Sequence, residues 1–192
     1  MKKILVVIVI LAGVFVSKTM LDGKKSFAET FKDPRDGQTY GIVKIGSQVW
    51  MAENLNYEVK LSHCQEEKSK NCQKYGRFYV WDEAVKACPP GWHLPSKWEW
   101  ETLFTTAGGQ LTAGKELKST SGWRSNGNGT DTYGFSALPA DGHQYGYYAM
   151  FWSSTETSST IAYHVALVNK HEGVGSGEND KNFGMAVRCV KD

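Results

Sequence analysis

The chain opens with a hydrophobic pattern that differs from everything after it. A basic pair at the N-terminus precedes an uninterrupted apolar block over residues 4–16, which polar residues follow. This order is typical of a bacterial secretory signal, and the block is shorter than the roughly 20 apolar residues that span a bilayer. We therefore expect residues 1–28 to direct export through the Sec route as a signal peptide cleaved near Ala28, or to remain as an N-terminal membrane anchor.

Two short helices are predicted in the first half of the chain. Ser96 is a natural N-cap, and Glu99 stands three residues later, which is the spacing of a capping box. Apolar residues then recur at helical spacing until Gly108 and Gly109 end the run. The other helix is predicted over residues 82–87, where acidic residues lead and a lysine stands near the end.

Strand signals are short, and most of them lie in the second half of the chain. Residues 40–45 and 48–52 predict a hairpin around Gly46. Residues 161–168 alternate between larger apolar residues and a second set that includes His164, which is the period of a sheet strand. Further strands are predicted at 75–81, 149–154 and 183–190. Loops are predicted in the polar, glycine-rich segments 125–131, 141–148 and 172–182.

Composition favours one exported domain and argues against a nucleic-acid partner. Twenty glycines, five prolines and seven tryptophans favour a loop-rich α+β fold of short strands over a helical bundle. The whole chain carries a charge of +2, but residues 1–28 hold five lysines and one aspartate, so residues 29–192 carry about −2. Binding to nucleic acid therefore has no electrostatic support. Residues 29–192 are long enough for one domain with its own core.

Four cysteines, all in the part predicted to be exported, indicate two disulfides. Three pairings are possible. Cys64 and Cys72 bracket a short, charged segment, and pairing them locally would leave Cys88 to join Cys189 across the chain. We expect the segment between Cys64 and Cys72 to be an exposed excursion held by its own disulfide.

Five short motifs follow one another along the chain. They are YGRFYVW at 75–81, ACPPGWHLPS at 87–96, GFSALP at 134–139, FWSSTE at 151–156 and VRCV at 187–190. Together with the N-terminal hairpin they resemble the Fibrobacter succinogenes major paralogous domain, in which they occur in the same order. The resemblance covers about residues 31–192 and predicts a single domain over residues 29–192. It implies a secreted or cell-surface location more than a chemistry, because that family is known mainly as exported domains of undetermined activity.

A more distant similarity concerns the fold. Residues 94–96 with Glu99, followed far downstream by the terminal segment 183–189, are similar to the C-type-lectin-like superfamily, including its formylglycine-generating-enzyme branch. The similarity implies two short helices ahead of a compact set of short, mostly antiparallel strands. It also implies a disulfide between the first half of the chain and the last strand, which is the pairing of Cys88 with Cys189.

We expect no catalytic set in this sequence. Cys189, the only late cysteine, is predicted to be consumed in a disulfide, which argues against formylglycine-generating chemistry. His93 lies between two apolar residues and is predicted to be a packed, hydrogen-bonded histidine, not a base. Glu99 is explained as a helix cap, and it points away from Glu101 on the same helix. An enzyme with an unfamiliar site is therefore the least favoured hypothesis.

Sugar binding requires fewer precisely placed groups than catalysis does. Exposed aromatic rings stack on sugar faces, and polar side chains hydrogen-bond the hydroxyls. The segment 141–148 has this composition, and its candidate ligand-binding residues are Asp141, Gln144, Tyr145, Tyr147 and Tyr148. Packing of the last two tyrosines beneath the loop is the competing interpretation.

Calcium is the alternative to a domain without any cofactor. Asn128, Asp131 and Asp180 lie in polar, glycine-rich segments and offer oxygen ligands. Their spacing does not match an EF-hand, and the sugar-and-calcium tripeptides of true C-type lectins are absent. Solvated turns are therefore the favoured interpretation, and we expect no other metal.

Two main hypotheses follow. The first is an exported, non-enzymatic binding or adhesion domain that presents its loops to a polysaccharide or a cell-surface protein. The second is a structural cell-envelope protein whose aromatic residues all belong to the core. An exposed aromatic platform would favour the first, a featureless surface the second, and a pocket with converging carboxylates an enzyme. A membrane contact is expected only through the N-terminal segment.

Overall fold

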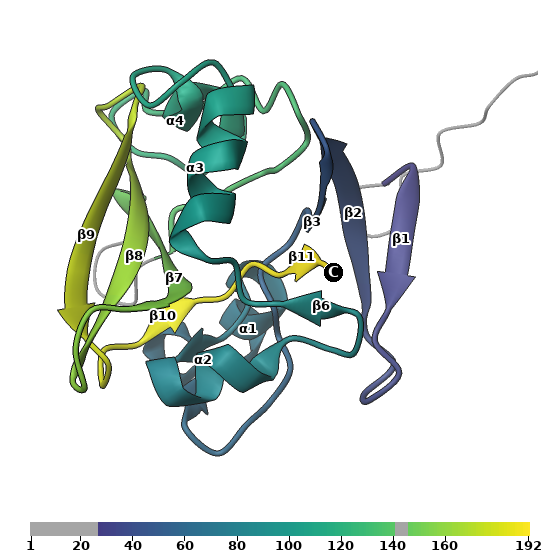
Figure 1. The fold of residues 1–192 in the computed structure, drawn as a ribbon. Helices are drawn as coiled ribbons and strands as arrows, with labels where there is room; N and C mark the ends of the chain where they lie inside the picture. The colour runs from purple at the N-terminus through teal and green to yellow at the C-terminus, as the bar shows by residue number, and fades with distance from the viewer. Residues whose placement is uncertain (1–26, 141–145) are drawn as a thin grey trace, which may run out of the picture.

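The computed structural model describes residues 27–140 and 146–192, and within them two β-sheets lie on either side of helix α3, Lys97–Thr106 (Figure 1). The first sheet has the order β1-β2-β3-β11-β6, with strands Glu29–Lys32, Thr39–Ile45, Gln48–Met51, Val190–Lys191 and Trp92–His93. The second has the order β4-β5-β10-β7-β8-β9, with strands Ser62–His63, Phe78–Tyr79, Met185–Ala186, Tyr148–Glu156, Ile161–Val168 and Val174–Asp180. Among these strands only β10 and β7 pair in parallel. The prediction of an α+β fold with short, mostly antiparallel strands is confirmed.

Elements with a strong local signal form where the sequence predicts them. β2 and β3 pair as a hairpin around Gly46, whose φ is +61°. The Ser96 hydroxyl accepts a hydrogen bond from Glu99 N–H, and the Glu99 carboxylate accepts one from Ser96 N–H, which completes the capping box of α3. Helix α2 spans Trp81–Ala87, and β8 coincides with the predicted strand 161–168.

The prediction of only two helices is wrong. Helix α1, Ser69–Tyr75, lies in the lysine-rich excursion next to the 3-10 turn η1, Gln65–Glu67, and α4 spans Ala113–Leu117. Helix α1 buries only Cys72, so its sequence shows no repeat of apolar residues from which a helix could be predicted. Helix α4 is a short element that receives support from outside itself, since Lys115 N–H donates to Glu172 O. Tertiary contacts, which a local pattern does not contain, stabilise both helices.

Three strand and loop predictions also need correction. The segment 75–81, predicted to be a strand, is one only at Phe78–Tyr79, because Tyr75 ends α1 and Trp81 begins α2. The segment 172–182, predicted to be a loop, contains β9, because residues from Val174 to Asp180 pair with β8. The polar, glycine-rich composition hides a strand whose conformation depends on its neighbour. The segment 183–190, predicted to be one strand, divides between β10 in the second sheet and the start of β11 in the first. The C-terminal segment therefore connects the two sheets.

Aromatic rings fill the space between α3 and the sheets. Trp100 of α3 packs against Trp50 of β3 at a centroid distance of 4.9 Å and against Phe151 of β7 at 5.6 Å. Six of the seven tryptophans are buried, and the exception is Trp98, which is 75% exposed. Helical spacing places Trp98 on the face of α3 opposite the buried Trp100. The aromatic residues thus serve mainly the core.

Both disulfides of the local-pairing scheme are present. Cys64–Cys72 joins the start of η1 to α1, and Cys88–Cys189 joins the end of α2 to the residues before β11, with a sequence separation of 101. In the chain-entropy model the short loop contributes about 2–3 kcal/mol and the long one about 4–5 kcal/mol to the free energy of unfolding. The long-range bond therefore supports the whole domain, whereas the short one supports the excursion.

The predicted signal peptide or anchor, residues 1–28, falls almost wholly outside the described residues. Where the chain is described, no helix combines the length and the apolar character that crossing a membrane requires. Strand β1 begins at Glu29 and pairs with β2, so regular structure begins at the expected start of the domain.

Candidate functional site

Residues from several sequence motifs meet at a buried guanidinium. Arg188 is 1% exposed and donates hydrogen bonds to Asn54 Oδ1 and to the carbonyl oxygens of Met51 and Phe135. Its Cζ also lies 4.4 Å from the centre of the Phe135 ring. Burial lowers the pKa of Arg188, but a guanidinium keeps its charge at neutral pH, so these partners hold a cation in the core. The motifs that contain these residues specify the core and not a ligand site.

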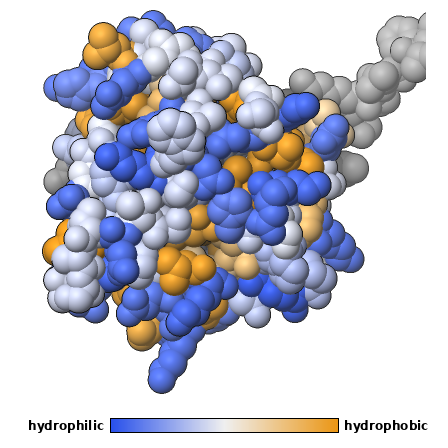
Figure 2. Space-filling view, in the orientation of Figure 1, coloured by the Kyte–Doolittle hydropathy of each residue, from blue (hydrophilic) through white to orange (hydrophobic). Residues whose placement is uncertain are grey.

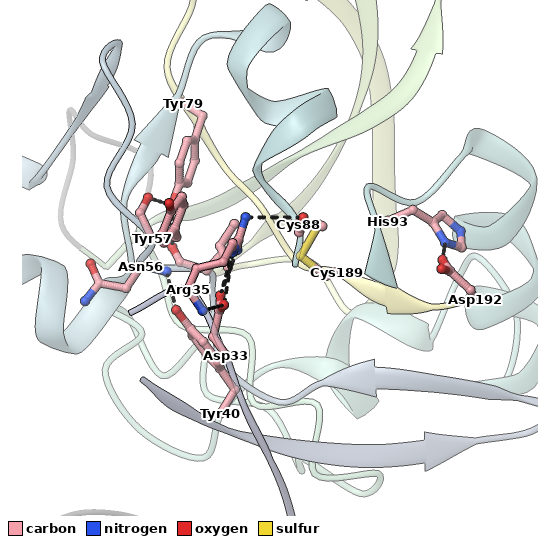
Figure 3. Close-up of a disulfide and its surroundings, with 11 residues drawn as sticks. Asp33, Arg35, Tyr40, Asn56, Tyr57, Tyr79, Cys88, His93, Cys189 and Asp192 are labelled. Carbon is pink, nitrogen blue, oxygen red and sulfur yellow. Dashed lines mark hydrogen bonds and ion pairs between the residues drawn. A yellow bond between two sulfur atoms is a disulfide. The ribbon is translucent and has the colours of Figure 1, made fainter. Parts of the chain in front are cut away.

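A second polar cluster ties the C-terminal residue to α3. His93 Nδ1 lies 2.6 Å from Asp192 Oδ1 (Figure 3), and His93 Nε2 lies 2.7 Å from Glu99 Oε1. Partial burial acts to lower the pKa of His93, but the hydrogen bonds to Asp192 and Glu99 outweigh it and raise the pKa above its ordinary value. The protonated ring donates through both nitrogens and has no lone pair for a substrate. This histidine is therefore unsuited to act as a general base.

A cleft of about 370 Å³ lies beside α1 and the Cys64–Cys72 disulfide. We call it the α1 cleft, and its lining residues are Asp36, Gln38, Asn56, Tyr57, Glu58, Cys64, Ser69, Cys72, Gln73 and Arg77. Three separate segments supply this lining: the turn before β2, the residues that follow β3, and the stretch from η1 through α1 to Arg77. The fold therefore brings together side chains that are up to 41 positions apart, from Asp36 to Arg77.

Carboxamides, carboxylates and one guanidinium face one another in the α1 cleft. Asn56 Nδ2 donates to Gln38 Oε1 at 3.0 Å, and Gln38 Nε2 donates to Asp36 Oδ2 at 2.7 Å. At the rim, Arg77 forms an ion pair of 2.7 Å with the exposed Glu58. Donors and acceptors therefore lie within reach of one another, which is what a ligand rich in hydroxyl groups requires.

Tyr57, the tyrosine in this lining, is held in place by residues that lie outside the lining. The Arg35 guanidinium lies 3.8 Å from the centre of the Tyr57 ring and forms a bidentate pair with the buried Asp33 (Figure 3). Burial acts to raise the pKa of Asp33, but the hydrogen bonds and charge of Arg35 hold it below its ordinary value. The Tyr79 hydroxyl donates to Tyr57 O at 2.7 Å. These contacts orient Tyr57 without help from a ligand.

Unpaired polar atoms gather around the same cleft. Five buried side-chain atoms lack a hydrogen bond among the residues that the structure describes, and four of them belong to Asn56, Gln65 and Arg77. Asn56 and Arg77 line the cleft, and Gln65 follows the disulfide residue Cys64. Buried polar groups are nearly always paired, and exceptions call for a partner such as a bound water, ion or ligand. Two of these atoms, Asn56 Oδ1 and Arg77 Nε, therefore belong to residues that line the α1 cleft.

The ligand-binding loop predicted from the sequence is only partly described. The candidates outside the described residues are Asp141, Gln144 and Tyr145. Tyr147 is half-buried, with Arg124 Cζ 5.4 Å from its ring centre, while Tyr148 at the start of β7 is 38% exposed. Neither tyrosine belongs to the lining of the α1 cleft.

The three calcium candidates take part in local turns. Asn128 Oδ1 accepts a hydrogen bond from Trp123 N–H, and both carboxylate oxygens of Asp131 accept bonds from Ser136. Asp180 Oδ1 accepts two bonds within its own turn. Within residues 27–140 and 146–192, no group of three or more His, Cys, Asp or Glu side chains is placed to hold a metal ion. Calcium binding by these residues stays a prediction for a binding measurement.

A comparison with protein families agrees with this arrangement of motifs. The model of the Fibrobacter succinogenes major domain matches residues 43–191, from β2 to β11. The chain belongs to this family. The family match includes Arg188 with its partners and the excursion with α1, whereas Asp36 and Gln38 of the cleft precede it. No curated protein and no solved structure matches the chain, and the more distant C-type-lectin-like similarity stays a prediction.

Sequence reasoning missed the α1 cleft because no single segment contains it. Its one local signal is the pair Cys64 and Cys72, which holds a polar excursion that has no obvious structural purpose. The signal does not reveal that Asn56 and Gln38 lie opposite this excursion, since that proximity depends on the path of the chain through β2 and β3.

Proposed function

We propose that this member of the Fibrobacter succinogenes major domain family is an exported, non-enzymatic binding domain. Its ligand is rich in hydroxyl groups, such as the sugar units of a surface polysaccharide, and it binds in the α1 cleft. The observation that carries the proposal is that two residues lining this cleft, Asn56 and Arg77, each hold a buried polar atom without a partner in the described part of the chain, among carboxamides and charged groups. Two disulfides support an oxidising, extracytoplasmic location.

The cleft lining has unused capacity for hydrogen bonds. Sugar hydroxyls both donate and accept, so they pair well with carboxamides, which also do both. Gln73, exposed on α1, makes no side-chain hydrogen bond in the described part of the chain. Asn56 and Arg77 carry the unpaired atoms, and both lie in the same lining. A hydroxylated ligand, alone or through bridging water, supplies the missing partners.

The carboxylates of the cleft suit binding better than hydrolysis. Glycoside hydrolysis generally needs two carboxyl groups, one of which is kept protonated by an apolar setting. Glu58 is exposed and paired with Arg77, and both oxygens of Asp36 accept hydrogen bonds from Gln38. Both carboxylates are thus engaged by polar partners and neither stands in an apolar setting. We therefore assign the cleft a binding role without catalysis.

The test is a binding screen of polysaccharides and oligosaccharides on the oxidised full-length chain, with and without calcium. For the strongest ligand, Gln73→Ala should lower the affinity about threefold to tenfold, as expected for the loss of one hydrogen bond. Lys70→Ala is the matched control, because Lys70 is exposed on the same helix but lies outside the cleft lining. It should leave the affinity unchanged.

A further variant separates the α1 cleft from the loop predicted in the sequence. Binding that survives Gln73→Ala but is lost in Tyr148→Ala would place the site at the start of β7 and contradict the proposal. Failure of every saccharide to bind in either calcium condition would reject a sugar ligand altogether.

A further inference from the structure

The second sheet ends in β9, whose outer edge has no neighbouring strand among the described residues. In the part of the chain that is described, β9 pairs with β8 alone. Lys181 N–H donates to Thr160 O, so the alternation of the antiparallel ladder directs the backbone groups of Ser176 and Glu178 away from β8. Val174 follows the same alternation, since its outward N–H donates to Gln110 O.

Within residues 27–140 and 146–192, only the middle of this edge lacks hydrogen-bond partners. Asp180 N–H is taken by the Asn179 side chain, and Asp180 O accepts from Phe183 N–H. Among the described residues, no hydrogen bond from outside the sheet engages the backbone of Ser176 or Glu178. The open stretch is long enough for a short extended segment to add as a further strand.

A pocket adjoins the open stretch on the face that α3 covers. It has a volume of about 180 Å³ and an apolar floor that includes Trp100, Phe104 and Val165. Ser176 of β9 lines it, together with Lys97 from α3. Side chains alternate between the two faces of a strand, so a residue added opposite Ser176 directs its side chain to this face. The pocket can therefore accept one apolar side chain of an added strand.

Charge decides which kind of segment fits. Glu178 makes no ion pair in the described part of the chain, whereas Lys181 is paired with Glu156 at 2.6 Å. The free charge at the edge is therefore negative. Hydrophobic residues on the visible face form separate groups between hydrophilic ones (Figure 2). Pairing of β9 with β9 of a second copy is disfavoured, because it brings two acidic strands together.

We infer that β9 and the adjoining pocket form a docking site for an extended basic peptide segment of a partner protein. The segment adds as a strand to β9, with an apolar side chain in the pocket and a lysine or arginine two positions away, opposite Glu178. This surface is separate from the α1 cleft, and the inference does not depend on a sugar ligand.

The test uses a fluorescent synthetic peptide in which leucine and lysine alternate with threonine, titrated against the oxidised full-length chain. The peptide should bind saturably, and it should shift the backbone amide NMR signals of Ser176 and Glu178 most strongly. The same peptide with glutamate in place of lysine should bind at least about tenfold more weakly, since it replaces attraction to Glu178 by repulsion. Glu178→Gln and Glu178→Lys should weaken binding of the lysine peptide in that order, by about twofold to fivefold per step.

A backbone variant separates strand addition from simple charge attraction. Ser176→Pro removes one outward N–H without removing a bond to β8, and it should lower the affinity about tenfold. Ser176→Ala keeps that N–H and should bind like the native chain. If Ser176→Pro does not fold, the Glu178 variants and the amide shifts of the native chain test the inference. Absence of binding, equal binding of the lysine and glutamate peptides, or amide shifts away from β9 would overturn the inference.

Discussion

The two disulfides mark regions that use polar groups in opposite ways. Beside Cys189, Arg188 is buried and each of its guanidinium nitrogens donates to an acceptor of the core. Beside Cys64–Cys72, Asn56 and Arg77 contain buried atoms without partners in the described part of the chain. In the first region the guanidinium nitrogens are all paired within the core. In the second, some buried polar atoms are unpaired in the described part of the chain and can bond a ligand.

This difference explains why the family motifs do not reveal a function. The motifs around Phe135 and Arg188 meet in the saturated core, so they report how the domain folds. The unsaturated region lies at the surface, in a polar excursion with little sequence pattern of its own. The proposed ligand site of this chain therefore lies apart from the residues that carry the family motifs.

The largest expected effect is a loss of stability on replacing the buried Arg188. Arg188→Met should lower the free energy of unfolding by about 3–5 kcal/mol, because Asn54 Oδ1 and two carbonyl oxygens lose their buried donor. Urea denaturation followed by tryptophan fluorescence measures this loss. Ligand binding in the α1 cleft should persist in the folded fraction. A loss of less than about 1 kcal/mol would mean that Arg188 does not support the core as described.

Removal of the Cys64–Cys72 disulfide should lower stability less than Arg188→Met does, but it should strongly weaken saccharide binding. The double variant Cys64→Ala and Cys72→Ala should lose about 2–3 kcal/mol, since its closed loop is short. Because the disulfide residues line the α1 cleft, saccharide binding should fall below detection while β9 still binds the lysine peptide. Thermal unfolding and the two binding titrations measure these outcomes. Unchanged saccharide affinity would show that the excursion does not form the site.

The smallest effect concerns the pH dependence of the C-terminal cluster. The pKa of His93 is raised above 6.5 in the folded chain, so its contribution is fully present below about pH 6.5 and is lost as the pH rises through the raised value. The pKa of Glu99 is lowered from 4.5, despite burial that acts to raise it, by hydrogen bonds from Ser96 and His93. Its contribution is lost as the pH falls below about 4.5.

The native chain should therefore exceed His93→Gln in stability most clearly between about pH 5 and pH 6.5, and the difference should shrink at alkaline pH. Urea midpoints across this range measure it. A difference that grows toward alkaline pH would contradict the assigned hydrogen bonds, while cleft binding should not change with this variant.

Elements whose signal lies within a few residues could be predicted from the sequence. The capping box at Ser96, the hairpin around Gly46 and the alternation of β8 each depend on local spacing. Strand β9 could not be predicted, because its glycines and polar residues become a strand only through pairing with β8. Helix α1 was missed for a related reason, since the Cys64–Cys72 bond replaces an apolar face.

The candidate site was less predictable than the fold. The composition of 141–148 suggested sugar binding, but composition does not show which polar groups lack partners. The contacts between Gln38, Asn56 and the excursion arise from the path of three segments. Unpaired atoms such as Arg77 Nε can be recognised only once the neighbours of each side chain are known.

The most direct measurement is a titration of the isotopically labelled chain with the strongest saccharide ligand, followed by NMR of backbone and side-chain amides. We predict that the largest shifts occur at Asn56, Gln73 and Arg77, including the Asn56 side-chain amide. Saturable binding with its largest shifts at Tyr148 or along β9, and none in the α1 cleft, would contradict this prediction.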